Sequence, residues 1–133
     1  MNVSELLNSG TKILKQNKIE THQLDSELVL SSLLKKKREN LLINLNEEVS
    51  KNIIDDFVKL IFRRANREPL AYILENKEFW SKDFFVDRNT LIPRPETELL
   101  CESVIKIFKN KNLNILDMGT GTGCIILSIL SEI

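Results

Sequence analysis

The chain has 133 residues, of which 42% are hydrophobic and 29% are charged, as in an ordinary globular protein. Its 19 basic and 19 acidic residues cancel, so it has no overall electrostatic signature of a protein that binds nucleic acid or anionic membranes. No apolar run approaches the ~18 residues of a membrane span, and the first residues lack the pattern of a secretory leader. We therefore expect a cytoplasmic protein with no membrane and no direct nucleic-acid partner.

Helical spacing of apolar residues dominates the first half of the chain and predicts a helical bundle over residues 1–69. Thr21 and Asn46 are predicted helix N-caps, and Pro69 ends the pattern. The expected buried positions are Leu6, Leu7, Ile13, Leu14, then Leu24, Leu28, Val29, Ser32, Leu33, then Val49, Ile53, Phe57, Leu60 and Ile61. By composition alone, such a bundle could be a binding module of any kind.

The second predicted helix ends in a basic run, residues 35–38. One interpretation is a contact with nucleic acid or the ribosome. The other, which we favour, is a solvated helix end, where cations interact well with the helix dipole.

The pattern changes at residue 70. Residues 70–74, 78–80 and 84–86 are rich in β-prone side chains, and Asn76 and Lys77 are expected at a turn. We predict a β-hairpin linker over residues 70–90. Phe79 and Trp80 could face a substrate, although packing of the hairpin is the simpler interpretation.

Two prolines around Arg94 predict a stiff extended segment, followed by a helix over residues 96–109. Its expected buried positions are Leu99, Leu100, Ser103, Val104 and Ile107. Residues 113–118 then read as a short apolar strand. Cys101 and Cys124 lie in apolar helix-like runs without metal-ligand spacing, which indicates buried core cysteines and no metal site.

Glycines alternate with threonines directly after this strand, at Gly119, Gly121 and Gly123, and a helix-like run follows. A strand, a glycine loop and a helix N-terminus are typical of the start of a nucleotide-binding α/β domain. Cys124 stands where the dinucleotide fingerprint needs its third glycine, and there is no P-loop. The Asp117 carboxylate would repel a pyrophosphate but suits a cationic ligand such as S-adenosylmethionine.

Several segments in order make the chain resemble the PrmC/HemK family of release factor glutamine methyltransferases. They are R-E-P-L-A-Y at 67–72, E-F-W at 78–80, L-I-P-R-P-E-T-E at 91–98 and I-L-D-M-G-T-G-T-G at 115–123, with D-S-E-L at 25–28 in the bundle. The resemblance implies an α/β fold with an N-terminal helical bundle (1–69), a β-hairpin linker (70–90) and the beginning of a class I, Rossmann-like methyltransferase domain (91–133).

The resemblance also implies a reaction, a cofactor and a partner. The family uses S-adenosylmethionine to methylate the side-chain amide of the glutamine in the Gly-Gly-Gln motif of peptide chain release factors, which the bundle helps to recognise. The implied cofactor-binding residues are Asp117, Gly119, Thr120, Gly121, Thr122 and Gly123, together with Leu91, Pro93 and Arg94. For Arg94, a salt bridge to Glu96 or Glu98 is an equal alternative.

The family's Asn-Pro-Pro-Tyr motif, which holds the glutamine amide, does not occur in this sequence. No catalytic residue is therefore assigned, and we expect the chain alone to be inactive, with residues 113–133 poorly packed. Two other hypotheses stay open. One is a non-catalytic helical binding module with a vestigial methyltransferase start, and the other is a nucleic-acid N6-adenine methyltransferase.

Overall fold

The computed structural model describes all 133 residues and divides into two compact units, residues 1–74 and 75–133. The chain is rich in helix and has one two-stranded antiparallel sheet. None of its helices combines the length and the apolar character that crossing a membrane requires.

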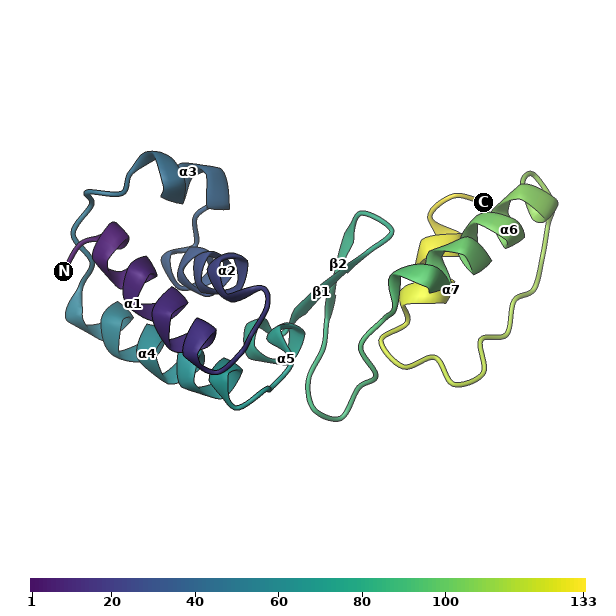
Figure 1. The fold of residues 1–133 in the computed structure, drawn as a ribbon. Helices are drawn as coiled ribbons and strands as arrows, with labels where there is room; N and C mark the ends of the chain where they lie inside the picture. The colour runs from purple at the N-terminus through teal and green to yellow at the C-terminus, as the bar shows by residue number, and fades with distance from the viewer. The chain divides into compact units, whose positions relative to one another are not determined.

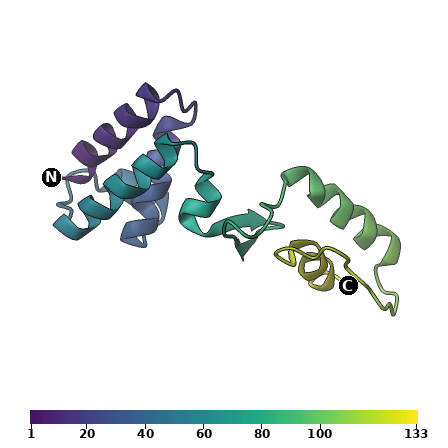
Figure 2. The same cartoon turned by 90° about the horizontal axis from the view of Figure 1, so that it is seen from below.

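Five helices form the first unit, and α1, α2 and α4 pack against one another (Figures 1 and 2). They are α1 (Val3–Gln16), α2 (His22–Leu34), α3 (Arg38–Ile43), α4 (Lys51–Ala65) and α5 (Leu70–Leu74). The buried core consists of Val3, Leu6, Leu7, Leu14, Ile19, Val29, Leu30, Leu41, Val49, Phe57, Ile61 and Ile73. The predicted helical bundle is thus present, and aliphatic side chains supply nearly all of its core.

The start of α1 is fixed by a capping box. The Asn2 side chain accepts a hydrogen bond from the backbone N–H of Glu5 at 2.9 Å, and the Glu5 carboxylate accepts one from the N–H of Asn2 at 3.0 Å. The neighbouring backbone is tied to the segment before α4, because the N–H of Val3 donates to the carbonyl of Glu47 at 3.0 Å. These bonds satisfy amide groups that would otherwise lack partners at a helix end.

Two acidic side chains of α2, Asp25 and Glu27, are buried, although neither belongs to the predicted apolar face. Asp25 accepts a hydrogen bond from Arg64 Nε at 2.6 Å, and Glu27 accepts one from Arg38 Nε at 2.5 Å. Leu24, predicted to be buried, is exposed. The face of α2 turned to the core is therefore rotated from the predicted one, and the ion pairs compensate the desolvation of its carboxylates.

Helix boundaries differ from the prediction at both ends of the segment between α2 and α4. The second helix ends at Leu34, and Lys35 adopts a left-handed conformation (φ 52°). Lys36 pairs with Glu47 at 2.6 Å, so two members of the basic run, Lys36 and Arg38, make ion pairs within the chain. The expected N-cap at Asn46 was wrong, because α4 begins five residues later and its N-cap is Ser50.

The second unit contains β1 (Asn76–Phe79), β2 (Lys82–Phe85), the 3₁₀ turn η1 (Pro95–Thr97), α6 (Glu98–Phe108) and α7 (Cys124–Leu130). The strands pair antiparallel as Asn76 with Phe85, Lys77 with Phe84, Glu78 with Asp83 and Phe79 with Lys82. The predicted hairpin exists, but its turn lies at Trp80 and Ser81 and not at Asn76 and Lys77.

The strand predicted over residues 70–74 was wrong, because these residues form α5. The backbone N–H groups of Tyr72 and Ile73 both donate to the carbonyl of Pro69, so Pro69 stands at the start of the helix. Proline is tolerated there because its missing N–H would have no helical partner, and leucine and alanine are strong helix formers.

The strand predicted over residues 113–118 is also absent, so the structure does not confirm the Rossmann-like opening. Leu116 and Met118 are 83% and 85% exposed, and Figure 1 draws this stretch as an open loop between α6 and α7. A parallel strand needs a neighbour to satisfy its backbone groups, and no other strand pairs with these residues. The fold class is therefore borne out for the helical part and not for the α/β start.

The buried face of α6 differs from the predicted one. Cys101 is fully buried, while Leu99, Leu100 and Ile107 are exposed. The small core of this unit consists of Phe79, Phe84, Cys101, Cys124 and Ile129. With only α7 and the hairpin in this core, a single narrow stripe of α6 becomes buried.

Candidate cofactor loop

The loop between residues 117 and 124 has the conformation that its glycines predict. Gly119, Gly121 and Gly123 all lie in the left-handed region, with φ of 79°, 57° and 78°. This region is costly for residues with a Cβ, so the glycines permit a turn that other residues would resist. At Gly119 an added Cβ would meet nothing within 4 Å, which leaves room for a ligand against the backbone.

Two threonine side chains form hydrogen bonds within the loop. Thr120 Oγ1 donates a hydrogen bond to the carbonyl of Asp117 at 2.8 Å, and Thr122 Oγ1 accepts one from the N–H of Cys124 at 3.3 Å. The N–H of Gly123 donates to the carbonyl of Thr120 at 2.9 Å. Gly123 is the N-cap of α7, and the Thr122 hydroxyl accepts a hydrogen bond from the first N–H of that helix.

Asp117 carries the most informative polar atom of the loop. Its Oδ2 is buried and has no hydrogen-bond partner in the chain. Ser31 Oγ and Ser128 Oγ are also buried without a partner, and a water molecule or a ligand can supply the partner of such an atom. A cationic group such as an ammonium or sulfonium fits this requirement, and the residues present therefore suit S-adenosylmethionine.

Hydrogen bonds join Asp117 to the glycine loop, whereas no hydrogen bond or ion pair joins this loop to Leu91, Pro93 or Arg94. Pro93 is buried, Arg94 is exposed and Leu91 is 79% exposed. The ion pairs of the structure do not include Arg94, so the predicted alternative of a salt bridge to Glu96 or Glu98 is not formed.

Glu98 has a role that the sequence did not indicate. Its carboxylate accepts a hydrogen bond from the backbone N–H of Trp80 at 2.8 Å, and the Trp80 indole donates to Glu132 at 3.2 Å. Trp80 and Ser81 both have positive φ, of 53° and 54°, in a two-residue turn where Asn-Gly is usual. No local sequence motif predicts this turn, because its hydrogen-bond partners Glu98 and Glu132 lie far along the chain.

Cys101 and Cys124 are buried free thiols, as predicted. Burial raises the pKa of the Cys101 thiol, with smaller contributions from Cys124 and Glu98. No cluster of potential metal ligands occurs in the chain.

The helices and the buried ion pairs define the first unit as a helical domain with its own core. A sequence model of the PrmC N-terminal domain family matches residues 5–74, which is nearly the whole of that unit. The chain belongs to this family.

Curated relatives match over a longer part of the chain. A release factor glutamine methyltransferase of Buchnera aphidicola (subsp. Baizongia pistaciae) is 44% identical over 110 residues, covering 82% of the chain and 40% of the relative. One of Coxiella burnetii is 42% identical over 136 residues, covering 98% and 45%. A bifunctional methyltransferase of Rickettsia typhi is 36% identical over 150 residues, covering 98% and 29%. The chain thus spans less than half of these relatives.

Proposed function

We propose that a protein carrying this chain transfers a methyl group from S-adenosylmethionine to the side-chain amide of the glutamine in the Gly-Gly-Gln motif of a peptide chain release factor. The observation that carries the proposal is the glycine loop with the unpartnered Asp117 oxygen, in a chain whose relatives are named release factor glutamine methyltransferases. The match to the PrmC N-terminal domain supports the same assignment.

S-adenosylmethionine, when bound, supplies a methyl group on a positively charged sulfur. In this proposal, the Asp117 carboxylate attracts the cationic end of the cofactor, and the glycine backbone lies against it. The loop residues Gly119, Thr120, Gly121, Thr122 and Gly123 line the methionine and ribose end. Leu91, Pro93 and Arg94 approach the cofactor from the extended segment before α6.

The proposed division of labour follows three segments. Residues 1–69 recognise the release factor, and residues 91–133 form the beginning of the cofactor-binding domain. Residues 70–90 are the linker between these two parts. An amide nitrogen is a weak nucleophile because its lone pair is delocalised, so positioning of the glutamine carries much of the catalysis. We assign that positioning to no residue of this chain.

A chimera tests the proposal. Residues 1–133 replace the matching segment of the Coxiella burnetii relative, and transfer of radiolabelled methyl from S-adenosylmethionine to a purified release factor is measured. We expect methylation of the glutamine of Gly-Gly-Gln, identified by mass spectrometry. Asp117→Ala should lower the initial rate about tenfold or more, because the cationic ligand loses its charged partner.

Asp83→Ala serves as the matched control, since Asp83 is an exposed aspartate of the linker and lies outside both the bundle and the cofactor loop. Its rate should equal that of the unmodified chimera. A chimera that folds and binds the release factor but transfers no methyl group would contradict the proposal. Equal rates for the two aspartate variants would show that Asp117 has no role in binding the cofactor.

A further inference from the structure

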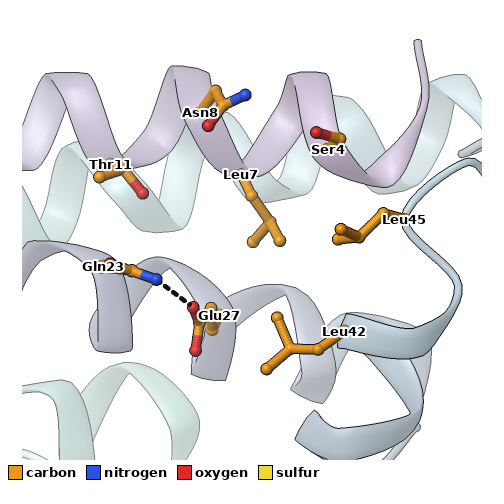
Figure 3. Close-up of a pocket in the computed structure, with 8 residues that line it drawn as sticks. All are labelled: Ser4, Leu7, Asn8, Thr11, Gln23, Glu27, Leu42 and Leu45. Carbon is orange, nitrogen blue, oxygen red and sulfur yellow. Dashed lines mark hydrogen bonds between the residues drawn. The ribbon is translucent and has the colours of Figure 1, made fainter.

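Glutamate side chains of this chain form both local and long-range hydrogen bonds. The Glu27 carboxylate, beside a hollow of the first unit, accepts one from Gln23 at 3.0 Å, four residues earlier on the same helix (Figure 3). The Glu98 carboxylate accepts one from the backbone N–H of Trp80 at 2.8 Å, 18 residues earlier and in a different element. The first bond orders the surface of one helix, whereas the second connects the hairpin turn to the start of α6.

Trp80 makes a second long-range bond through its side chain. The indole N–H donates to the Glu132 carboxylate at 3.2 Å. Glu132 follows α7, and its own N–H donates to the carbonyl of Ile129 at 3.0 Å, so the last turn of α7 determines its position. The N-cap of α7 is Gly123, the last glycine of the cofactor loop. One tryptophan is therefore bonded to the residue that follows the extended segment and to the helix that follows the glycine loop.

The core around Trp80 is small. Trp80 packs against a cluster that includes Phe79 of the hairpin, Cys101 of α6 and Cys124 of α7. Hydrophobic contacts have no preferred direction, whereas hydrogen bonds require a narrow range of distances and angles. The two bonds of Trp80 therefore determine how the hairpin, α6 and α7 are oriented around this core.

The backbone of the turn depends on the same contacts. Trp80 and Ser81 have positive φ, of 53° and 54°, a conformation that is unfavourable for residues with a Cβ. Such residues persist where the surrounding structure imposes the conformation, and they are frequent at functional sites. Here the carboxylate of Glu98 supplies the acceptor for the backbone N–H of Trp80.

The stretch between the hairpin and α6 is stiff. The N–H of Asp87 donates to Thr90 Oγ1 at 2.9 Å, which closes a local turn, and the two prolines of residues 91–98 restrict the part that follows. A stiff stretch that is held at both ends has few accessible positions, and release of one end makes many more accessible. The bond between Trp80 and Glu98 joins these two ends.

We propose that Glu98 and Glu132 are positioning residues, which hold Trp80 and thereby fix the extended segment 91–97 and the glycine loop in the arrangement that receives the cofactor. Neither carboxylate touches the cofactor in this proposal, because both act through Trp80. The inference rests on the proposed function. It explains how two segments that line the cofactor are held although no bond joins them to each other.

Nuclear magnetic resonance of the ¹⁵N-labelled 133-residue chain tests the two bonds without any cofactor. Trp80 is the only tryptophan, so its indole N–H gives one unambiguous signal. We expect Glu132→Ala to shift this signal, and Glu98→Ala to shift the Trp80 backbone amide and to speed hydrogen exchange over residues 91–97 about tenfold. Unchanged exchange over residues 91–97 in Glu98→Ala would overturn the proposal.

Cofactor affinity tests the positioning role. The chimera described above is titrated with S-adenosylhomocysteine in a calorimeter, so that no turnover occurs. Glu98→Ala should weaken binding about tenfold, whereas Glu98→Gln, whose amide oxygen still accepts the bond from Trp80, should stay within about threefold of the unmodified chimera. Glu102→Ala, exposed one turn later on α6, is the matched control and should leave binding unchanged.

The glutamine variant separates positioning from direct contact. If Glu98 paired with a cationic group of the cofactor, Glu98→Gln would lose as much affinity as Glu98→Ala, and the proposal would fail. Initial rates should agree with the titration, because Glu98→Ala should raise the KM for S-adenosylmethionine and change kcat less than twofold. Equal affinities of Glu98→Ala and Glu102→Ala would overturn this inference alone. An unmodified chimera that binds no S-adenosylhomocysteine would overturn the proposed function and this inference with it.

A double-mutant cycle tests the second bond. Trp80→Phe keeps an aromatic ring against the core and removes the indole N–H, and Glu132→Ala removes its acceptor. Each should weaken S-adenosylhomocysteine binding about threefold, since this bond is exposed, and the double variant should bind no more weakly than either single one. Losses that multiply in the double variant would show that Glu132 does not act through Trp80, and this would contradict the proposal.

Discussion

Gly10 decides how closely α1 approaches its neighbours. An added Cβ at this position would lie 2.6 Å from Phe57 Cζ and 2.6 Å from Ser26 Oγ. Phe57 and Ser26 are themselves buried, so neither side chain can move away easily. From the sequence, Gly10 was only a residue of low helix propensity within a helical pattern. The packing shows why a glycine stands there, because a larger side chain would not fit.

Replacing Gly10 with alanine should lower the free energy of unfolding, because the overpacking itself costs about 1–3 kcal/mol. This loss should outweigh the ~1 kcal/mol that alanine gains over glycine in a helix. Urea unfolding followed by circular dichroism at 222 nm measures it. Ser9→Ala, exposed on the same helix, is the control, and a Gly10→Ala chain as stable as this control would contradict the packing argument.

The ion pair between Asp25 and Arg64 should matter far more than a surface pair. Asp25 is almost fully buried, and Arg64→Ala would leave its carboxylate without its charged partner, at a cost of about 3–5 kcal/mol. Lys59→Ala breaks an exposed pair with Asp56 and should leave the free energy of unfolding nearly unchanged, because water screens that pair. Parallel urea unfolding curves provide the comparison. Similar midpoints for the two variants would show that Asp25 is solvated after all.

At the scale of elements, long amphipathic helices followed their sequence patterns and short elements did not. The apolar spacing of α1 and α4 identified most of their buried residues because each helix presents one face to a shared core. In α5, helix propensity and a leading proline prevailed over the β-prone side chains that the sequence pattern emphasised. The strand at 113–118 depended on a partner strand that its own residues could not supply.

Hydrogen exchange should separate these elements. Amides of Leu116 and Met118 should exchange within the first time points, because their backbone has no ladder to protect it. Amides in the buried parts of α1, α2 and α4 should be protected by several orders of magnitude, in keeping with the stability of the helical core. Mass spectrometry after pulse labelling measures both. Strong protection over residues 113–118 in the monomeric chain would contradict the open loop.

At the scale of the whole molecule, the two units differ in the size of their hydrophobic cores and therefore in their expected stability. The first unit has a continuous aliphatic core that joins all five of its helices, whereas the second has a core of five buried side chains. Buried apolar area is the main source of stability, so the first unit should hold its fold without help from the second.

A fragment of residues 1–74 should therefore fold alone. We expect a helical circular dichroism spectrum and a cooperative urea transition with a free energy of unfolding of a few kcal/mol, about what one core of this size supplies. The 133-residue chain measured beside it should show the same transition. A fragment that lacks a cooperative transition while the longer chain retains one would show that the first unit depends on the second.

The sequence by itself determined the helical bundle, the hairpin, the glycine loop and the family, because each rests on local patterns of spacing, turn residues or motif. The buried charges of α2, the turn at Trp80 and the buried face of α6 were decided by the tertiary structure. Each depends on which residues distant in sequence come into contact, and no local pattern encodes that. Asp117 belongs to both groups of features. The motif predicted its position in the loop, and the tertiary structure showed that its Oδ2 has no partner.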